Sequence, residues 1–189
     1  MSKPAPTPTK LTPLQVRGVF EARARAELAA ADGLAPGSDA VAWSGSLFAD
    51  VVAVKGLAGP AEASGGAALT GADGEAARKA LVALGWAEDA IFATLSRPEP
   101  GLSAERRSDR LRLQIEAVDP TLVLALDAEA AADIAEAFGI AQPAFGDEAR
   151  VLGRRIVAVD GLEASLSDPA RKKRVWRQLQ AAKAEGPVY

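Results

Sequence analysis

A glycine-rich segment is the first part of this sequence whose residues could do chemistry. Six glycines surround Glu62 directly after the apolar run 50–55: Gly56, Gly59, Gly65, Gly66, Gly71 and Gly74. Successive backbone N–H groups in such turns can cradle a base or a phosphate, and a carboxylate such as Glu62 can position a water. The alternative reading is a flexible surface loop that carries a solvated glutamate, and the residues alone leave both readings open.

Two further acids follow predicted strands. Asp127 comes after the run 121–126, and Asp160 comes after the run 155–159. Carboxylates at strand ends can bind a metal ion, but Asp127 also precedes an alanine-rich helical segment and suits its N-cap. We therefore predict helix capping at Asp127 and no metal site.

Positive charge is densest near the C-terminus, at Arg171, Lys172, Lys173, Arg174 and Arg177. With the nearby Ser165, these cations could contact DNA phosphates. The competing interpretation is an amphipathic helix whose cations are solvated while its other face packs inward. We expect the same solvated role for a second arginine group, and we expect Trp86 and Trp176 to be packing anchors. That group comprises Arg106, Arg107, Arg110 and Arg112.

Composition excludes several kinds of chemistry. The 189 residues include no cysteine and no histidine, so thiol nucleophiles, zinc fingers, iron–sulfur clusters and imidazole bases are absent. Lys and Arg number 22 against 25 Asp and Glu, a net charge of −3. Any contact with nucleic acid therefore depends on a local basic face. We expect no cofactor.

The elements that position these residues follow from periodicity. Apolar runs predict strands, and helical patterns ending at glycine or starting at a capping residue lie between them. The strands are expected at 50–55, 90–95, 121–126 and 155–159, and the helices at 14–31, 75–84, 103–118, 127–138 and from 169 onward. This alternation predicts an α/β protein with a parallel sheet.

The domain organisation is expected to be simple. Residues 1–13 are predicted to form a disordered arm, and residues 14–189 a single domain. No apolar stretch is long enough for a membrane span or a secretion signal, so a cytoplasmic protein is expected. Ligands of parallel sheets sit beyond the carboxyl ends of the strands. Three loops qualify, at 56–73, 96–102 and 160–167.

In this order, the three loops resemble those of the uracil-DNA glycosylase superfamily, most closely its bacterial families four and five. The family's first motif, Gly-Glu-Ala-Pro-Gly or Gly-Leu-Ala-Pro-Ala, is similar to Gly56–Ala61, and its Gly-x-Pro-Phe-x-Gly segment is similar to Gly66–Gly74. Later stretches at 111–126 and 165–176 are similar as well. The resemblance spans about 50–183 and rests on ordered spacing. It implies a three-layer α/β/α fold around a four-stranded, mostly parallel sheet.

The resemblance also implies a base pocket, and its key groups are replaced here. The water-positioning acid of family four falls on Gly56 or Leu57, and the base-stacking aromatic falls on Leu69. The His-Pro-Ser triplet falls on Gly161, Leu162 and Glu163. The uracil-reading Asn has no counterpart, and the cysteines of the family's iron–sulfur cluster are missing.

The lost histidine matters most for the reaction. Excision requires a flipped nucleotide and stabilisation of negative charge on the departing base. One well-aimed donor contributes about 3–4 kcal/mol to this step. Gly161 offers only a backbone N–H, and an ionised Glu163 would oppose an anionic leaving group. We therefore expect a uracil-DNA-glycosylase-like protein without base-excision activity, which binds DNA through a local basic face or binds a protein partner.

Two alternatives remain at this stage. The first is a divergent glycosylase that uses backbone donors of the Gly56–Gly59 turn and a carboxylate such as Glu62 on a water. The second is a small-molecule-binding α/β module unrelated to DNA. The residues of the expected ligand loop are Gly56, Leu57, Gly59, Leu69, Gly71, Gly161 and Leu162, and the candidates for contact with the DNA backbone are Ser165, Arg171, Lys172 and Lys173.

Overall fold

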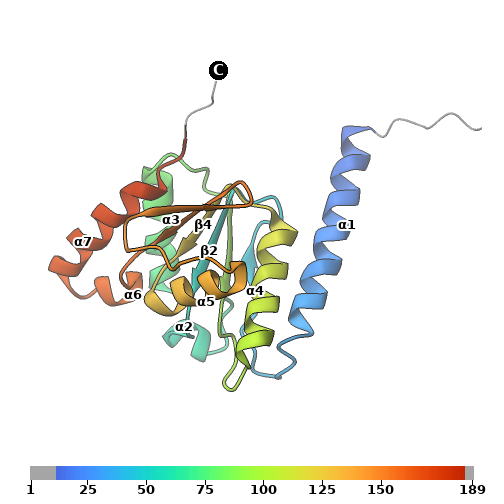
Figure 1. Cartoon of the computed structure of the whole chain (residues 1–189), viewed down its shortest axis with the longest axis horizontal. Coiled ribbons are helices and arrows are strands. Elements are labelled where there is room, and N and C mark those ends of the chain that lie inside the picture. The colour runs from blue at the N-terminus through green and yellow to red at the C-terminus, as the bar shows by residue number, and fades with distance from the viewer. Residues whose placement is uncertain (1–11, 186–189) are drawn as a thin grey trace, which may run out of the picture.

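The computed structural model describes residues 12–185, so almost all of the predicted N-terminal arm lies outside the described residues. Six strands form one mixed sheet in the order β1-β3-β2-β4-β6-β5 (Figure 1). Their bounds are β1 Ser44–Gly45, β2 Val51–Lys55, β3 Ile91–Leu95, β4 Leu122–Ala125, β5 Glu148–Val151 and β6 Arg154–Ala158. The α/β class predicted from the sequence is confirmed.

The expected number of four strands was wrong. β3, β2, β4 and β6 are parallel to one another, but β1 and β5 add an antiparallel strand at each edge. The four parallel strands are buried along their whole length, whereas β5 alternates between exposed and half-buried residues. An edge strand of this kind lacks the continuous apolar run by which buried strands are recognised.

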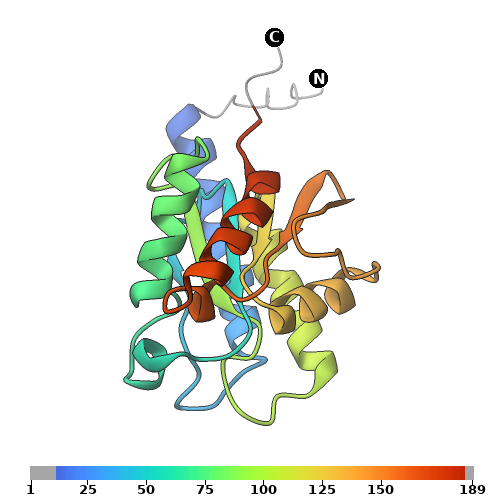
Figure 2. The ribbon, with the colours of Figure 1, turned by 90° about the vertical axis from the view of Figure 1, so that its left-hand side faces the viewer.

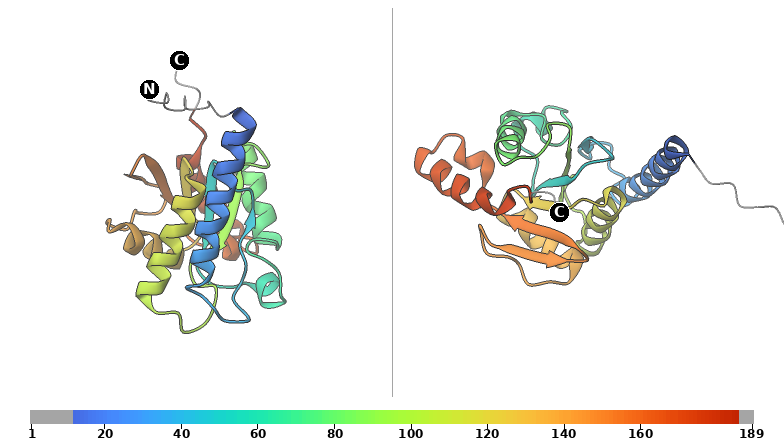
Figure 3. Two further views of the ribbon diagram at one scale, coloured as in Figure 1. Left: turned by 90° about the vertical axis from the view of Figure 1, so that its right-hand side faces the viewer. Right: turned by 90° about the horizontal axis from the view of Figure 1, so that it is seen from above.

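Helices cover both faces of the sheet. On one face lie α3 (Ala72–Ala83), α6 (Leu162–Ser165) and α7 (Pro169–Leu179), which Figure 2 shows from their own side. On the other face lie α4 (Ala104–Val118) and α5 (Ala128–Phe138). The helix α1 (Pro13–Asp32) packs against α4 as an outer layer (Figure 3).

The hydrophobic core has two halves, one on each face of the sheet, and alternate residues of β2 contribute to each half. Val51 and Ala53 of β2 pack on the side of α3 and α7, and Val52 and Val54 pack on the side of α4 and α5. Alternate residues of a strand point to opposite faces, so a continuous apolar run fills both halves. None of the helices within residues 12–185 is long and apolar enough to cross a membrane.

Parallel pairing aligns the carboxyl ends of the central strands. Val54 of β2 is opposite Ala125 of β4, and Ala125 is opposite Ala158 of β6. The loops that follow these strands therefore meet at one edge. The first of them is ordered and contains the short helix α2 (Pro60–Ala63), which the sequence analysis missed.

Candidate functional site

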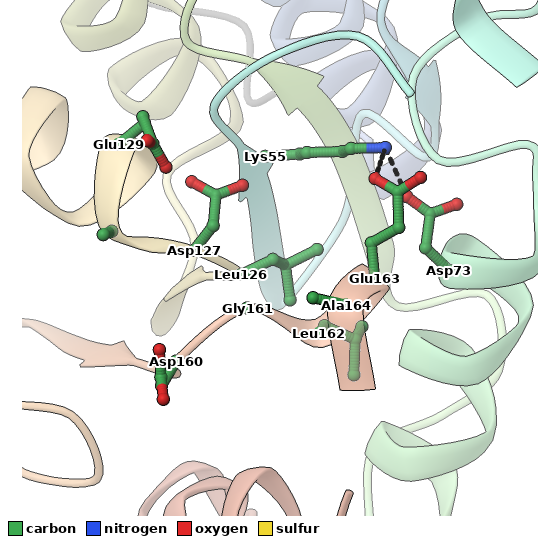
Figure 4. A pocket seen from close by; sticks show the side chains of 11 residues that line it. Lys55, Asp73, Leu126, Asp127, Glu129, Asp160, Gly161, Leu162, Glu163 and Ala164 are labelled. Carbon is green, nitrogen blue, oxygen red and sulfur yellow. Dashed lines mark hydrogen bonds and ion pairs between the residues drawn. The ribbon is translucent and has the colours of Figure 1, made fainter. Parts of the chain in front are cut away.

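Lys55, the last residue of β2, is the centre of a buried ion cluster. Its Nζ lies 2.6 Å from Asp73 Oδ2 and 2.8 Å from Glu163 Oε2 (Figure 4). It also lies 3.3 Å from Glu62 Oε2. The three carboxylates come from α2, α3 and α6, so one ammonium joins the consecutive helices α2 and α3 to α6, which is distant in the sequence. The side chains of Lys55, Glu62 and Asp73 are each less than a tenth exposed.

Glu62 is fixed by the loop that carries it. Its Oε2 accepts the backbone N–H of Gly59 at 2.9 Å, and its Oε1 accepts the backbone N–H of Leu69 at 2.9 Å. Together with the ammonium of Lys55, these donors engage both carboxylate oxygens. Glu62 therefore closes the loop between α2 and α3, and its side chain is fully buried, so it is not placed to hold a water from solvent.

The charge state of Lys55 follows from its neighbours. Burial alone would lower the pKa of Lys55, but hydrogen bonds to Asp73 and Glu163 and the nearby charge of Glu62 outweigh burial and raise the pKa above its ordinary value. An amine nucleophile must be neutral to attack. The raised pKa keeps Lys55 protonated at neutral pH, so its ammonium neutralises the buried carboxylates of Glu62 and Asp73.

A cavity of about 440 Å³ opens beside this cluster, beyond the carboxyl ends of β2, β4 and β6. Figure 4 shows Asp127 and Glu129 across the cavity from Asp73 and Glu163. The lining holds five carboxylates and one ammonium: Asp73, Asp127, Glu129, Asp160 and Glu163, with Lys55. Most charged side chains of the lining are therefore acidic, although Arg174 forms an ion pair with Asp160 at 3.3 Å.

Asp127 is the N-cap of α5, as the sequence predicted. Its Oδ1 accepts the N–H of Ala130 at 2.8 Å, and its Oδ2 accepts the N–H of Gly56 at 2.9 Å. Burial raises the pKa of Asp127, and these two backbone hydrogen bonds oppose the rise. A side chain at Gly56 would collide with Asp127 and Glu129, which explains the glycine.

The third loop lines the cavity through residues predicted from the sequence. Gly161, Leu162 and Glu163 all contribute to the wall. Gly161 has a φ of +75°, a conformation that favours glycine, and it begins α6. Leu162 is buried in the core. Glu163 is the charged residue of the three, and it forms an ion pair with Lys55.

The other predicted ligand-loop residues do not line the cavity. Leu57 is half exposed outside it, and the N–H of Gly59 is donated to Glu62. Leu69 is buried in the core with a φ of +54°, so it presents no surface on which a base could stack. Gly71 is the N-cap of α3 and packs against Ala61. None of these four residues is part of the cavity wall, and the loop that carries them folds around Glu62.

The basic segment was only partly interpreted correctly. Ser165 is buried and its hydroxyl donates to the carbonyl of Leu162, so it cannot contact a DNA backbone. Arg171 is half-buried. Lys172 and Lys173 are exposed, and neither forms an ion pair with any residue between 12 and 185. Of the four candidates for contact with the DNA backbone, the two lysines keep their charge available.

Two expectations about large side chains were wrong. Arg110 was expected to be solvated, but it is 2% exposed and its Nη1 donates to the carbonyl of Leu95 at 2.9 Å. Burial lowers the pKa of Arg110 to about 10, and the charges of Asp32 and Glu99 oppose this. Trp176 was expected to be a packing anchor, but it is 43% exposed. Trp86 does pack inward, and its indole N–H donates to Ala182.

Loop 96–102 does not reach the acidic cavity. Its Pro98 and Pro100 instead line a separate hollow of about 580 Å³ with the far side of the glycine-rich loop. Ser96, the first residue of this loop, is buried, and its hydroxyl donates to the buried Asp133 at 2.6 Å. Two of the three predicted loops therefore meet at the candidate site, and the third does not.

Lys55 and Asp73 were missed by sequence reasoning. A lysine that ends an otherwise apolar strand was the available signal, because a cation inside a buried run needs a counter-charge.

Within residues 12–185, no group of three acidic side chains is arranged to hold a metal ion. The fold and this site define an α/β protein with a buried ion cluster beside an acidic cavity. No model of a known protein family matches the chain, and no curated protein is similar to it in sequence.

Proposed function

We propose that this chain is a binding protein on a scaffold similar to the uracil-DNA glycosylases, and that it does not excise bases. One observation carries the proposal: the groups that a residual glycosylase would need are already engaged by the protein itself. The N–H groups of Gly56 and Gly59 are donated to carboxylates, and both oxygens of Glu62 accept protein hydrogen bonds. These two N–H groups are therefore not available to a departing base, and the fully buried Glu62 is not available as a base for water.

The charge around the cavity supports the same conclusion. Glu163, at the position that resembles the family's His-Pro-Ser motif, is ion-paired with Lys55. A carboxylate there raises the energy of an anionic leaving group, whereas an aligned donor would stabilise it by about 3–4 kcal/mol. The five carboxylates of the lining also repel a phosphodiester backbone.

The acidic cavity favours a small cationic ligand. Its volume of about 440 Å³ suits a small molecule. Glu129 is exposed and lines the cavity, and its carboxylate forms no ion pair with another residue of the described range 12–185, so it can accept from an amine or a guanidinium. The small-molecule alternative from the sequence is therefore the better supported ligand class for this cavity.

Base excision is tested with oligonucleotides that carry uracil, hypoxanthine or xanthine, in single- and double-stranded form. The protein is incubated at equimolar concentration for several hours, and the DNA is then treated with alkali. We expect no strand breakage above the rate without protein. Breakage that disappears in Glu62→Gln would overturn the proposal, because it would require a working carboxylate at the turn.

Ligand charge is tested by calorimetry with agmatine and spermidine as cationic probes and deoxyuridine monophosphate as an anionic probe. We expect heat of binding only with the amines, and weaker binding in Glu129→Gln, which leaves the Lys55 cluster intact. Glu116→Gln on the exposed face of α4 is the matched control. Binding of the nucleotide without binding of the amines would contradict the assigned ligand class.

A further inference from the structure

A second concave surface lies between α3 and α7, on the outside of the helical layer. It is a groove of about 410 Å³ with an apolar lining, to which Ala76 and Ala80 of α3 and Val175 and Leu179 of α7 contribute. The short side chains of Ala76 and Ala80 do not fill the space between α3 and α7, so the groove stays open between the two helices. A shallower hollow of about 390 Å³ adjoins it and shares Ala76, Ala80, Lys172 and Trp176.

Apolar side chains are exposed at the rim of this groove. Trp176 is 43% exposed and Leu166 is 38% exposed, and both line the groove. A half-exposed tryptophan beside an aliphatic hollow is unusual for a solvated surface. Tryptophan is among the residues that contribute most to protein–protein contacts.

The two charged side chains that line the groove are positive, and neither forms an ion pair within the described residues. These side chains are Lys172 and Lys173. Lys79, at the far side of the adjoining hollow, is paired with Glu75 within α3. A partner that places carboxylates over Lys172 and Lys173 would therefore gain attraction without displacing an internal ion pair.

We propose that the groove between α3 and α7 binds an acidic amphipathic segment of a partner protein. Large apolar side chains of that segment fill the hollow beside Trp176, and its carboxylates contact Lys172 and Lys173. The apolar lining favours a peptide over DNA, because a DNA backbone would leave the hollow without an apolar partner. This groove shares Leu162 with the acidic cavity but none of the charged residues of the Lys55 cluster, so the proposal is independent of whether bases are excised.

The test is a selection from a library of random 16-residue peptides displayed on phage, performed with the full chain. We expect enrichment of sequences that combine aspartate or glutamate with leucine, phenylalanine or tryptophan. The most enriched peptide is then synthesised with a fluorophore, and its affinity is measured by anisotropy. We expect the double variant Lys172→Glu/Lys173→Glu to weaken binding at least about tenfold.

Two further variants separate the groove from general charge effects. Ala80→Trp fills the hollow and should abolish binding, with circular dichroism and thermal unfolding as checks on its fold. Arg106→Glu/Lys183→Glu makes the same change in net charge at exposed positions outside the groove and should bind like the wild type.

Four outcomes would overturn the proposal. The first is no enrichment over a selection on Ala80→Trp, and the second is an enriched consensus without acidic residues. The third is a 20-mer DNA duplex that displaces the peptide and itself binds in a manner dependent on Lys172 and Lys173, which would assign the surface to nucleic acid. The fourth is a concentration-dependent dimer that is lost in Ala80→Trp, which would assign it to a second copy of this chain.

Discussion

Asp73 Oδ2 lies 2.6 Å from Lys55 Nζ and joins the first turn of α3 to the last residue of β2. Both side chains are almost fully buried. The ion pair therefore fixes the position of α3 over the sheet edge, in a place where neither charge has access to much water. Removal of one partner would leave the other charge buried without compensation.

Lys55→Met should destabilise the protein strongly. The substitution keeps the length of the side chain but leaves Glu62 and Asp73 buried without their cation, and breaking such a pair costs about 3–5 kcal/mol. Urea unfolding followed by circular dichroism measures the change in the free energy of unfolding. Lys79→Met is the matched control, because its ion pair with Glu75 is exposed to solvent and contributes little to stability. Equal losses in the two variants would contradict the role of the cluster.

Asp127 and Asp168 are the N-caps of α5 and α7, and their pKa values should lie on opposite sides of the ordinary aspartate pKa. Burial raises the pKa of Asp127 above 3.8, although Gly56 and Ala130 donate to it. Hydrogen bonds from the backbone of Arg171 and Ala170 lower the pKa of Asp168 below 3.8. Carboxyl carbon shifts followed by NMR between pH 2 and pH 7 should therefore give a higher midpoint for Asp127.

These shifts have opposite effects on stability. The stabilising contribution of Asp168 is present above pH 3.8 and is lost as the pH falls through its lowered pKa. For Asp127, the cost of burying the ionised carboxylate is present above its raised pKa and disappears as the pH falls below 3.8. The reverse order of the two midpoints would rule out this account.

Gly74→Ala should destabilise the protein by about 1–3 kcal/mol, the usual cost of an overpacked site. Gly74 lies in the first turn of α3, where an added Cβ would collide with the backbone carbonyl of Leu69. A backbone atom cannot move aside as a flexible side chain can. Gly18→Ala in α1 is the control, since nothing lies near the added methyl group there, and it should be stabilising by up to about 1 kcal/mol. Thermal unfolding measures both changes.

Asp133→Asn should cost about 2–3 kcal/mol, the range for hydrogen bonds to a charged group. The Asp133 carboxylate is buried, accepts from Ser96 and Arg97, and lies 2.9 Å from Arg107 Nε. Asparagine keeps the shape but removes the charge that both arginines need. Glu136→Gln, at the exposed partner of Arg107, should change the free energy of unfolding by less than about 1 kcal/mol. Urea titration of both variants checks this difference.

Much of the architecture was predictable from local pattern. Runs such as Val51–Lys55 and Leu122–Ala125 are continuous and apolar because the strands are buried on both faces. Parallel pairing then brought the loops at 56–73 and 160–167 together, as expected. The two edge strands were missed because β1 has two residues and β5 alternates without an apolar run.

The chemistry of the site was less predictable, because it depends on distant partners. Nothing near Lys55 in the sequence indicates that its counter-charges are Asp73 and Glu163. Glu62 was expected either to position a water or to be a solvated loop residue, yet the fold of the loop around it made Glu62 a buried structural acceptor. Arg110 was likewise not recognised, since it is one of four arginines in its helix and only the tertiary packing shows which one is buried.

The strand β5 has a consequence for association between molecules. It covers β6, and its Glu148 and Arg150 place charges along the outer margin of the sheet. A strand of another molecule that paired with β5 would have to desolvate both charged groups, and charged edge strands are a known barrier to such edge-to-edge pairing. Fibril growth from this side of the native protein should therefore require prior detachment of the β5–β6 hairpin.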